Sequence, residues 1–449
     1  EIVFAATRAG LRYTPINRYL SAEEIAYIVD DCEAGALLGD ARFGDLMQQT
    51  AQRCPRATTR LAVGGSIDGF EDYADALDDQ DGADIDDPQL GARMLYTSGT
   101  TGRPKGVVRR PNYSTRLEAI NDAPQYRPGG VHMNLCTGPY YHGGPLTFSL
   151  QMPLSQGVGI VIMEKWDAEQ ALRLIQQHRI THTHMVPTMF HRLLRLPPQV
   201  RAKYDVSSMQ YILHGAAPCP VASKRGMMDW FGPILWEYFA ATEGSGASCS
   251  PQQWLRKPGT VGLPPSRDHV RILDDDGEPR APGEVGNIYL KGDGELDFRY
   301  HGDPQKTEAA HRGAYFTVGD IGYLDEDGFL FITDRNANVI ISGGVNIYPA
   351  EVEAILLEHE AVKDAAVVGV PDEEWGEQVK AIVQVAQLPR DADALASDLI
   401  AFSRDRIAHF KCPRSVEFVT DLPRDDNGKL YRRKLLQQRR GVGARAAGS

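Results

Sequence analysis

Short apolar runs alternate with amphipathic helical patterns in the middle of the chain, and this alternation restricts the fold more than any other feature. The run at 157–163 (GVGIVIM) is continuously apolar, and 168–178 (AEQALRLIQQH) repeats apolar residues at helical spacing. The same pair recurs at once, as a run at 181–186 (THTHMV) and a helical pattern at 188–194 (TMFHRLL). Because strands joined by helices run parallel and are covered on both faces, the alternation predicts an α/β layer fold.

The pattern changes twice further along the chain. From about residue 258, turn sequences such as DDDG and PG separate short apolar runs, which is typical of antiparallel hairpins. From about residue 334, helical patterns at 352–359 and 395–407 enclose two apolar runs, which predicts a small α+β unit. A chain of 449 residues exceeds what one core usually supports, so we expect two domains, at 1–334 and 335–449.

Charge and cysteine content argue against several classes of function. The formal net charge of −12 argues against nucleic acid or an anionic membrane as the main partner. The six scattered cysteines contain no CxxC pair, which favours a reducing compartment and indicates neither a disulfide framework nor a zinc site. The longest apolar run, at 157–163, is too short to span a bilayer, and no signal-peptide pattern is visible, so a cytoplasmic location is expected.

The segment 96–108 (YTSGTTGRPKGVV) combines glycines, hydroxyl residues and two cations between two short runs of strand type. Glycine lets backbone N–H groups turn toward a ligand, hydroxyls add donors, and Lys105 adds positive charge, so the segment can cradle a polyphosphate. The segment is not a Walker A motif, because Gly106 and a β-branched run follow the lysine in place of Ser or Thr and a helix. It also lacks the GxGxxG order of the dinucleotide fingerprint. On composition alone, a flexible polar loop remains the other interpretation.

Three further segments place polar or small residues where a nucleotide can use them. The segment 237–244 (EYFAATEG) ends an apolar run with Thr242 and Glu243, which suit a phosphate oxygen and Mg²⁺, although a surface acid is equally consistent. The segment 214–218 (HGAAP) is either a platform for a flat ring or a tight turn. Asp320 is expected in a turn before a strand, where it can accept from ribose hydroxyls or only stabilise the turn.

Five segments resemble, in order and spacing, the adenylate-forming superfamily of acyl-CoA synthetases, firefly-type luciferases and adenylation domains of peptide synthetases. They are YTSGTTGRPKGV, YFAATEG, FTVGD, DRNANVIISGGVNIYP and LPRDDNGKLYRRK. The AATEG form, HGAAP and PDEEWGEQVKAIV (371–383) are most similar to fatty-acid–CoA ligases. The resemblance covers nearly the whole chain.

This resemblance implies a fold and a reaction. The fold is α/β, with a large N-terminal domain of doubly wound sheets plus a small β-barrel-like part, followed by a small mobile α+β C-terminal domain. In the reaction, which requires Mg²⁺, a carboxylate attacks the α-phosphate of ATP to give an acyl-adenylate and pyrophosphate, and the thiol of coenzyme A then displaces AMP. Such chemistry needs charge neutralisation and alignment rather than a protein nucleophile.

The resemblance also implies a role for each motif. The residues implied to bind the phosphates of ATP are Thr97, Ser98, Gly99, Thr100, Thr101, Gly102 and Lys105. Those implied to surround the adenine and the ribose are Gly215, Ala216, Ala217, Tyr238, Phe239, Asp320 and Arg335. Thr242 would contact the α-phosphate, Glu243 would bind Mg²⁺, and Lys429 on the swinging small domain would bridge the carboxylate and the α-phosphate. Gly343 and Gly344 would let the backbone pass close to the pantetheine arm of coenzyme A.

The segment 139–146 (PYYHGGPL) resembles the motif beside the acyl pocket, so His142 and Tyr141 are expected to gate that pocket. The residues that can line an apolar tunnel, or pack in the core instead, are Val186, Met189 and Phe190. These segments contain no Lys or Arg for a second carboxylate, so an apolar monocarboxylic acid is expected: a fatty acid, or a bulky alicyclic or aryl acid. His182 and His184 share a strand face but lack a suitably spaced carboxylate, which argues against a transition metal.

Two departures from the family pattern keep other functions open. Ala337 stands where the family usually has Asp or Lys at its hinge. The opening segment of this chain corresponds to a segment that lies several dozen residues into family members, so part of the first subdomain is expected to be absent. The alternatives are an acyl-AMP ligase that passes its acyl group to a carrier protein, and a nucleotide-binding protein without full turnover. The family resemblance also leaves a homodimer and loose membrane association open.

Overall fold

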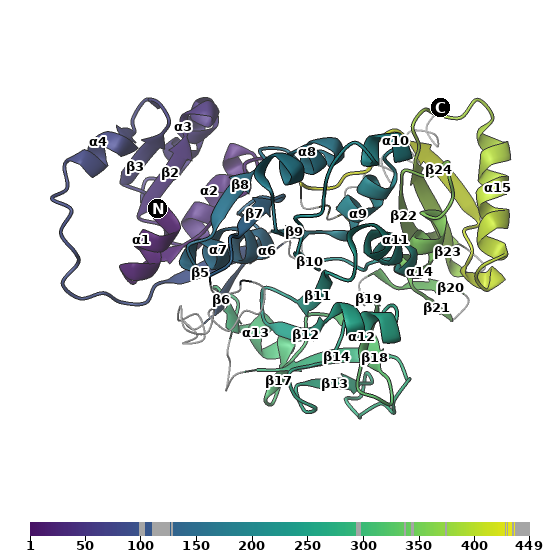
Figure 1. Cartoon of the computed structure of the whole chain (residues 1–449). Coiled ribbons are helices and arrows are strands. Elements are labelled where there is room, and N and C mark those ends of the chain that lie inside the picture. The colour runs from purple at the N-terminus through teal and green to yellow at the C-terminus, as the bar shows by residue number, and fades with distance from the viewer. Residues whose placement is uncertain are drawn as a thin grey trace, which may run out of the picture.

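The computed structural model describes residues 1–97, 104–109, 126, 129–292, 298–335, 338–342, 345–372, 375–426, 428, 430–432 and 435. Its centre is a six-stranded sheet with the order β12-β11-β10-β9-β7-β8 (Figure 1). The strands are β7 (Met133–Cys136), β8 (Gly159–Ile162), β9 (His182–Met185), β10 (Tyr211–His214), β11 (Leu235–Ala240) and β12 (Ser245–Cys249). β12 pairs antiparallel with β11, whereas the other neighbours pair in parallel.

Helices cover both faces of this sheet. On one face lie α8 (Ala168–His178), α9 (Pro187–Leu194) and α11 (Val221–Phe231), joined to the strands by a continuous apolar core. On the other face lie α6 (Gly143–Leu146), the π-helix η3 (Thr147–Gln151) and α7 (Met152–Ser155), with η3 against β7 and β9. The alternation predicted over 157–194 is therefore confirmed as β8, α8, β9 and α9.

A four-stranded sheet and a three-stranded sheet extend the N-terminal part. The first has the order β1-β5-β6-β15, with β1 (Arg12–Tyr13), β5 (Ala92–Thr97), β6 (Lys105–Arg109) and β15 (Phe298–Tyr300). The second is parallel, with β2 (Ala36–Asp40), β3 (Thr59–Val63) and β4 (Glu71–Asp72). The helices of this region are α1 (Ile2–Arg8), α2 (Ala22–Asp31), η1 (Ala41–Phe43), α3 (Gly44–Arg53) and α4 (Tyr73–Asp78).

The hairpins expected after residue 258 form an antiparallel sheet below the central one in Figure 1. Its strands are β13 (Val270–Leu273), β14 (Gly286–Lys291), β16 (His311–Arg312), β17 (Tyr315–Phe316), β18 (Asp320–Leu324) and β19 (Leu330–Arg335). The helices not yet named in the N-terminal part are α10 (Pro198–Arg201), α12 (Pro251–Arg256) and α13 (Pro304–Ala310). Together with the central sheet, they complete a large α/β part, as the sequence predicted.

The C-terminal part is a five-stranded sheet with helices packed against it. Its strands are β20 (Ile340–Ser342), β21 (Val345–Ile347), β22 (Asp364–Asp372), β23 (Gly376–Gln384) and β24 (Ser415–Val419). Its helices are α14 (Pro349–Leu356), α15 (Ala392–Arg404) and η5 (His409–Lys411). This is the small α+β unit expected from the sequence, whereas the boundary at 334/335 stays a prediction.

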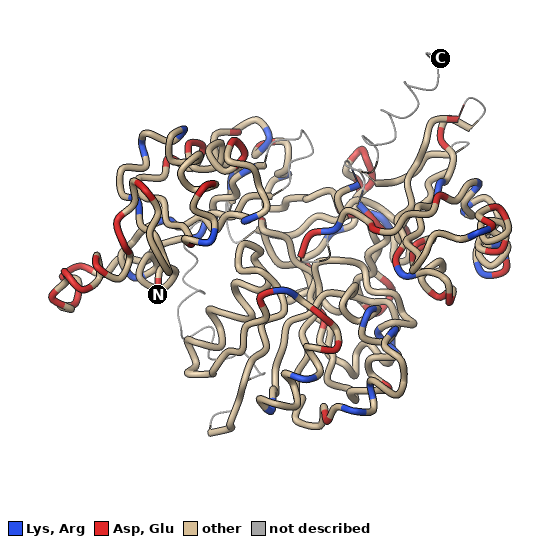
Figure 2. Tube along the Cα trace, turned by 90° about the horizontal axis from the view of Figure 1, so that it is seen from above, with Lys and Arg blue, Asp and Glu red and all other residues tan. Residues whose placement is uncertain are grey.

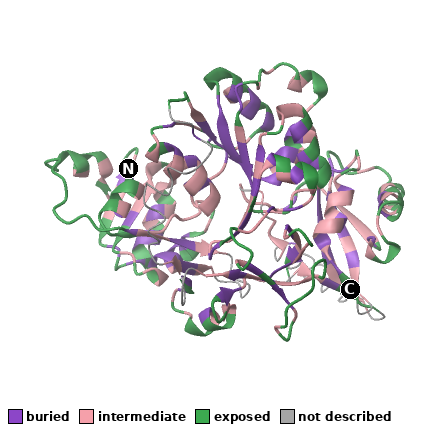
Figure 3. Cartoon of the chain, turned by 60° about the horizontal axis from the view of Figure 1, so that its bottom comes forward, coloured by how far each residue is buried: buried purple, intermediate pink, exposed green. Residues whose placement is uncertain are grey.

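The apolar cores of the described residues divide at the same place. Figure 3 shows how buried and exposed residues are distributed over the chain. Five clusters of buried apolar side chains form, and none contains residues from both sides of 335. Polar contacts cross instead. Asp334 accepts from the backbone N–H of Ala350 at 3.0 Å, and Arg195 donates to the carbonyls of His359 and Val362 at 2.6 and 2.5 Å. Each part therefore has its own core.

Charge is distributed unevenly over the chain. Between Leu61 and Ala92 there are ten Asp or Glu residues and no Lys or Arg. This stretch includes α4 and forms the acidic arm at the left of Figure 2. Among the described residues, no helix is both long and apolar enough to cross a membrane.

Candidate active site

The phosphate-loop motif lies between two paired strands. Thr97 ends β5 and Lys105 begins β6, and the two residues face each other in the antiparallel pair. The predicted residues between them, which lie outside the described residues, are Ser98, Gly99, Thr100, Thr101 and Gly102. Lys105 Nζ lies 3.2 Å from Asp303 Oδ2. This ion pair ties the hairpin to α13, whose N-cap is Asp303.

A second lysine, which the sequence interpretation missed, lies beside Lys105. Lys306 on α13 places its Nζ 4.6 Å from the centroid of the Tyr300 ring. Burial and the neighbouring Lys105 lower the pKa of Lys306 to about 8. Two adjacent amines that repel each other favour an anion between them. No local motif singles out Lys306, because its neighbour is about two hundred residues away in sequence.

Two buried carboxylates share the next part of the site. Glu243 is 6% exposed, and its Oε1 accepts from the hydroxyl of Tyr300 at 2.9 Å. Asp320 is equally buried, and burial raises its pKa, an effect that the charges of Glu243 and Asp334 reinforce and Arg335 opposes. A buried carboxylate with remaining acceptor capacity suits a hard cation, so Glu243 fits a magnesium ligand.

The expected ribose pair is formed across two strands. Asp320 in β18 faces Arg335 in β19, and Arg335 Nε donates to Asp320 Oδ1 at 2.9 Å. The prediction that Asp320 lies in a turn is wrong, because the turn ends at Gly319 and Asp320 is the first residue of β18. The acid is therefore fixed by the sheet, with the guanidinium of Arg335 partly exposed beside it.

The expected adenine segment follows β10. A Cβ on Gly215 would lie 2.6 Å from the backbone oxygen of Tyr238, so only glycine permits this approach to β11. Ala216 has a φ of +67°, an unusual conformation for a residue with a side chain. Phe239 is next in β11, and Thr242 lies with Glu243 in the turn before β12. The remaining residue, Ala217, follows in the same turn after β10.

The candidate gate residues contact the C-terminal part. His142 is the N-cap of α6, and its Nε2 lies 3.3 Å from Oδ2 of Asp425. A Cβ on Gly428 would lie 2.2 Å from Oγ1 of Thr188 at the start of α9. Asp425, Asp426 and Gly428 therefore dock on the large part, near Tyr141, whose pKa is raised by burial and by the two acids. The predicted Lys429, Gly343, Gly344 and Ala337 lie outside the described residues.

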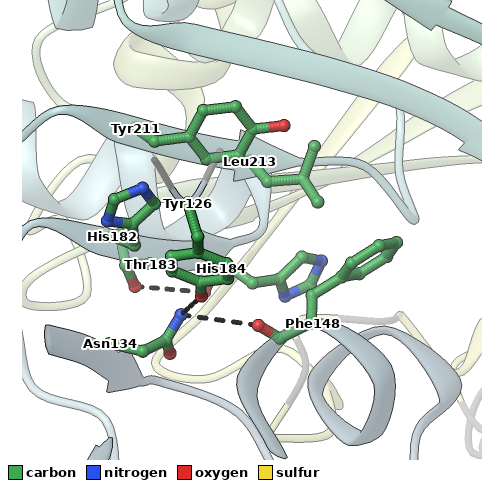
Figure 4. A pocket seen from close by; sticks show the side chains of 8 residues that line it. All are labelled: Tyr126, Asn134, Phe148, His182, Thr183, His184, Tyr211 and Leu213. Atoms are coloured by element: carbon green, nitrogen blue, oxygen red, sulfur yellow. Dashed lines mark hydrogen bonds between the residues drawn. The ribbon is translucent and has the colours of Figure 1, made fainter. Parts of the chain in front are cut away.

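A small cavity opens beside these residues, between η3 and the strands β7, β9 and β10 (Figure 4). We call it the aromatic recess. Its lining residues are Tyr126, Asn134, Phe148, His182, Thr183, His184, Tyr211 and Leu213. Its volume is about 10 Å³, close to what a single water needs.

The residues expected either to line a tunnel or to pack belong to the core. Val186, Met189 and Phe190 are at most 4% exposed and pack with α8 and α11. His182 and His184 point to the opposite face of the sheet, into the recess (Figure 4). Among the described residues, no three His, Cys, Asp or Glu side chains cluster as a metal site would require.

Comparison with known proteins supports the resemblance. The model of the AMP-binding enzyme family matches residues 1–296, and that of its C-terminal domain matches residues 351–429. A long-chain-fatty-acid–CoA ligase of Bacillus subtilis is 36% identical over 78% of this chain and 62% of its own length. An indoleacetate–CoA ligase of Aromatoleum aromaticum is 32% identical over 97% of this chain and 85% of its own.

A solved structure extends the likeness to three dimensions. The O-succinylbenzoate coenzyme A synthetase of Bacillus subtilis, in complex with ATP and magnesium ion, superposes with a TM-score of 0.77 at 28% identity. The superposition covers 96% of this chain and 86% of that one. The family model alone spans well over half of the chain. The chain therefore belongs to the AMP-binding enzyme family.

Proposed function

We propose that this chain is an AMP-forming acid–coenzyme A ligase, which activates a carboxylic acid with ATP and Mg²⁺ and transfers the acyl group to coenzyme A. The observation that carries the proposal is the docking of Asp425 against His142 and of Gly428 against Thr188, just before Lys429 in the sequence. Because Lys429 follows these docked residues in sequence, their docking supports a role for this lysine at the site of Glu243 and Asp320. A protein that only bound nucleotide would have no use for it.

The residues divide the work of adenylation among them. Lys105 and Lys306 would neutralise phosphate charge, Asp320 with Arg335 would hold the ribose, and Gly215 would let the adenine lie close to β11. Mg²⁺, when bound by Glu243, would add positive charge at the phosphates. Lys429 would align the carboxylate with the α-phosphate. These contributions need no protein nucleophile, because the carboxylate itself attacks.

We propose that the acid has a single carboxylate and that the rest of the molecule is uncharged. No Lys or Arg is found among the described residues that line the recess, so a second carboxylate would have no partner there. The relatives named above act on a fatty, an aromatic and a succinylated acid, and so leave the tail open. We also propose that residues 1–334 and 335–449 are the two domains, because each side of the boundary has its own apolar core.

The test is AMP release from ATP and Mg²⁺ across a panel of acids, each with and without coenzyme A. The expected result is AMP formation that requires both one class of acid and coenzyme A. AMP formation that ignores coenzyme A but responds to an acyl-carrier-protein thiol would favour the carrier-protein ligase. Nucleotide binding without AMP from any acid would reject the proposal.

A further inference from the structure

The aromatic recess and the candidate nucleotide residues are separated by one layer of side chains. The ring of Tyr238 is close to both sides: a Cβ on Gly215 would lie 2.8 Å from it, and a Cβ on Gly144 would lie 2.8 Å from its hydroxyl. The same Cβ on Gly144 would lie 3.0 Å from the His184 ring, which lines the recess. Tyr238 and Gly144 therefore lie between the expected adenine segment at Gly215 and the recess.

The walls of this passage suit a flat ring. Phe148 on η3 lies nearly parallel to His184, with 5.7 Å between ring centroids and 21° between planes, and it packs on Tyr238 at 5.1 Å. His184 Nε2 and the Tyr238 hydroxyl are 3.0 Å apart. Burial lowers the pKa of His184 to about 4, so its ring is neutral near pH 7. Phe148 thus stacks on the His184 ring and contacts the Tyr238 ring at a tilt of 52°, and both arrangements are favourable for aromatic pairs.

The far wall of the recess contains an unmet acceptor. Asn134 is 2% exposed, and its Nδ2 donates to the Tyr126 hydroxyl at 2.9 Å and to the carbonyl of Phe148 at 3.4 Å (Figure 4). These two contacts set the orientation of the amide. Its Oδ1 is buried and has no hydrogen-bond partner among the described residues. A buried acceptor without a donor is costly, so the position suits a donor such as a water or a ligand hydroxyl.

The size of the cavity limits that donor. At about 10 Å³ it holds one water or one hydroxyl beyond the rings. An aliphatic tail would leave Asn134 Oδ1 unsatisfied, and a charged group would meet no opposite charge among the described lining residues. The Tyr126 hydroxyl accepts from Asn134 and keeps its own proton to donate. A neutral hydroxyl satisfies both groups.

From this we infer, on the basis of the proposed ligase function, that the acid is an aryl carboxylic acid with a hydroxyl group at the end of the ring far from the carboxylate. Its ring takes the place of the Phe148 side chain, and its hydroxyl donates to Asn134 Oδ1. Phe148 lies on the π-helix η3, and π-helical turns are frequent at functional sites.

The experiment uses pairs of acids that differ only in a para hydroxyl. Benzoate, phenylacetate, 3-phenylpropanoate and cinnamate are each compared with the 4-hydroxy form, and decanoate represents the fatty acids. For at least one spacer length, the hydroxylated acid is expected to have a kcat/KM roughly 10- to 100-fold above its partner. The kcat/KM for decanoate is expected to be lower than that for the hydroxylated acid.

Three variants assign the preference to the recess. Asn134→Leu keeps roughly the side-chain volume and removes the acceptor, so the ratio of the hydroxylated to the unsubstituted acid should fall to near 1. Tyr126→Phe removes only one hydroxyl and should lower the ratio in part. Thr183→Val is the matched control, because Thr183 lines the recess but its hydroxyl already donates to the carbonyl of Leu135 at 2.8 Å. Its ratio should equal that of the parent.

Binding of the same acid pairs to the parent and variants, measured by calorimetry in the presence of ATP without Mg²⁺, separates this inference from the ligase proposal. If no acid yields AMP, the ligase proposal fails, while the binding ratio still decides the inference. A ratio near 1 in the parent by both methods would mean that only water fills the recess, and would overturn the inference. The inference would also be overturned if the ratio of the hydroxylated to the unsubstituted acid stayed at the parent value in both Asn134→Leu and Tyr126→Phe.

Discussion

At the scale of single residues, the buried carboxylate of Glu243 offers a sharp test. Glu243→Gln keeps the shape and the bond from Tyr300 but removes the charge that would hold Mg²⁺. We expect the rate of adenylation to fall about 100-fold or more, as when one electrostatic contact in an active site is lost. Pyrophosphate release measured against Mg²⁺ concentration checks this. Tyr300→Phe is the control, since it keeps the charge and should lose far less.

A second residue-scale prediction concerns stability rather than activity. The pKa of His184 is about 4 in the folded chain because of burial, against about 6.5 when unfolded. Its contribution to stability is therefore complete above about pH 6.5 and declines as the pH falls toward 4, by about 3 kcal/mol in total. Urea unfolding between pH 7 and pH 4.5 should be less pH-dependent in His184→Gln than in the parent. Parallel curves would contradict the assignment.

At the scale of elements, α13 and β6 act as a pair. Asp303 caps the helix and binds Lys105, which places Lys306 beside that lysine. Because the pKa of Lys306 is lowered to about 8, its charge is lost as the pH rises through that value. The KM for ATP should therefore increase above pH 8 in the parent. In Lys306→Arg it should stay flat, since arginine keeps its charge; an equal rise in both would exclude Lys306 from phosphate binding.

Elements also mark what sequence reasoning can reach. The alternation over 157–194 predicted β8, α8, β9 and α9 because periodicity is a local property. Asp320 was misassigned because the turn signal of Gly319 adjoins it and pairing with Arg335 is not local. Lys306, Asp425 and the partners of Asn134 were missed for the same reason: each lies near its partner only once distant strands and loops have been brought together.

At the scale of the whole molecule, the docking of Asp425 and Gly428 on the large part predicts two separable half-reactions. Lys429→Ala should abolish formation of the acyl-adenylate but spare the reaction of supplied acyl-adenylate with coenzyme A. Asp425→Asn should weaken the first half-reaction in the same direction but less, because the contact with His142 holds the segment in place. Stopped-flow assays of each half-reaction measure both effects.

Asp426→Asn is the matched control for this series, since Asp426 is more exposed and lies 3.7 Å from Arg18. It should change neither half-reaction appreciably. Equal loss of both half-reactions in Lys429→Ala would reject a swing of the small part between them.

The division of the apolar cores at residue 335 has a thermodynamic consequence. Apolar surface newly exposed to water raises the heat capacity, whereas breaking polar contacts does not. Contacts such as those of Asp334, Arg195 and Asp425 cross the boundary, and no apolar cluster of the described residues does. Separation of the two parts should therefore raise the heat capacity far less than global unfolding does, because unfolding also exposes the apolar cores. A van't Hoff plot of the equilibrium between docked and undocked forms should then be closer to a straight line than the corresponding plot for global unfolding, which curves with temperature.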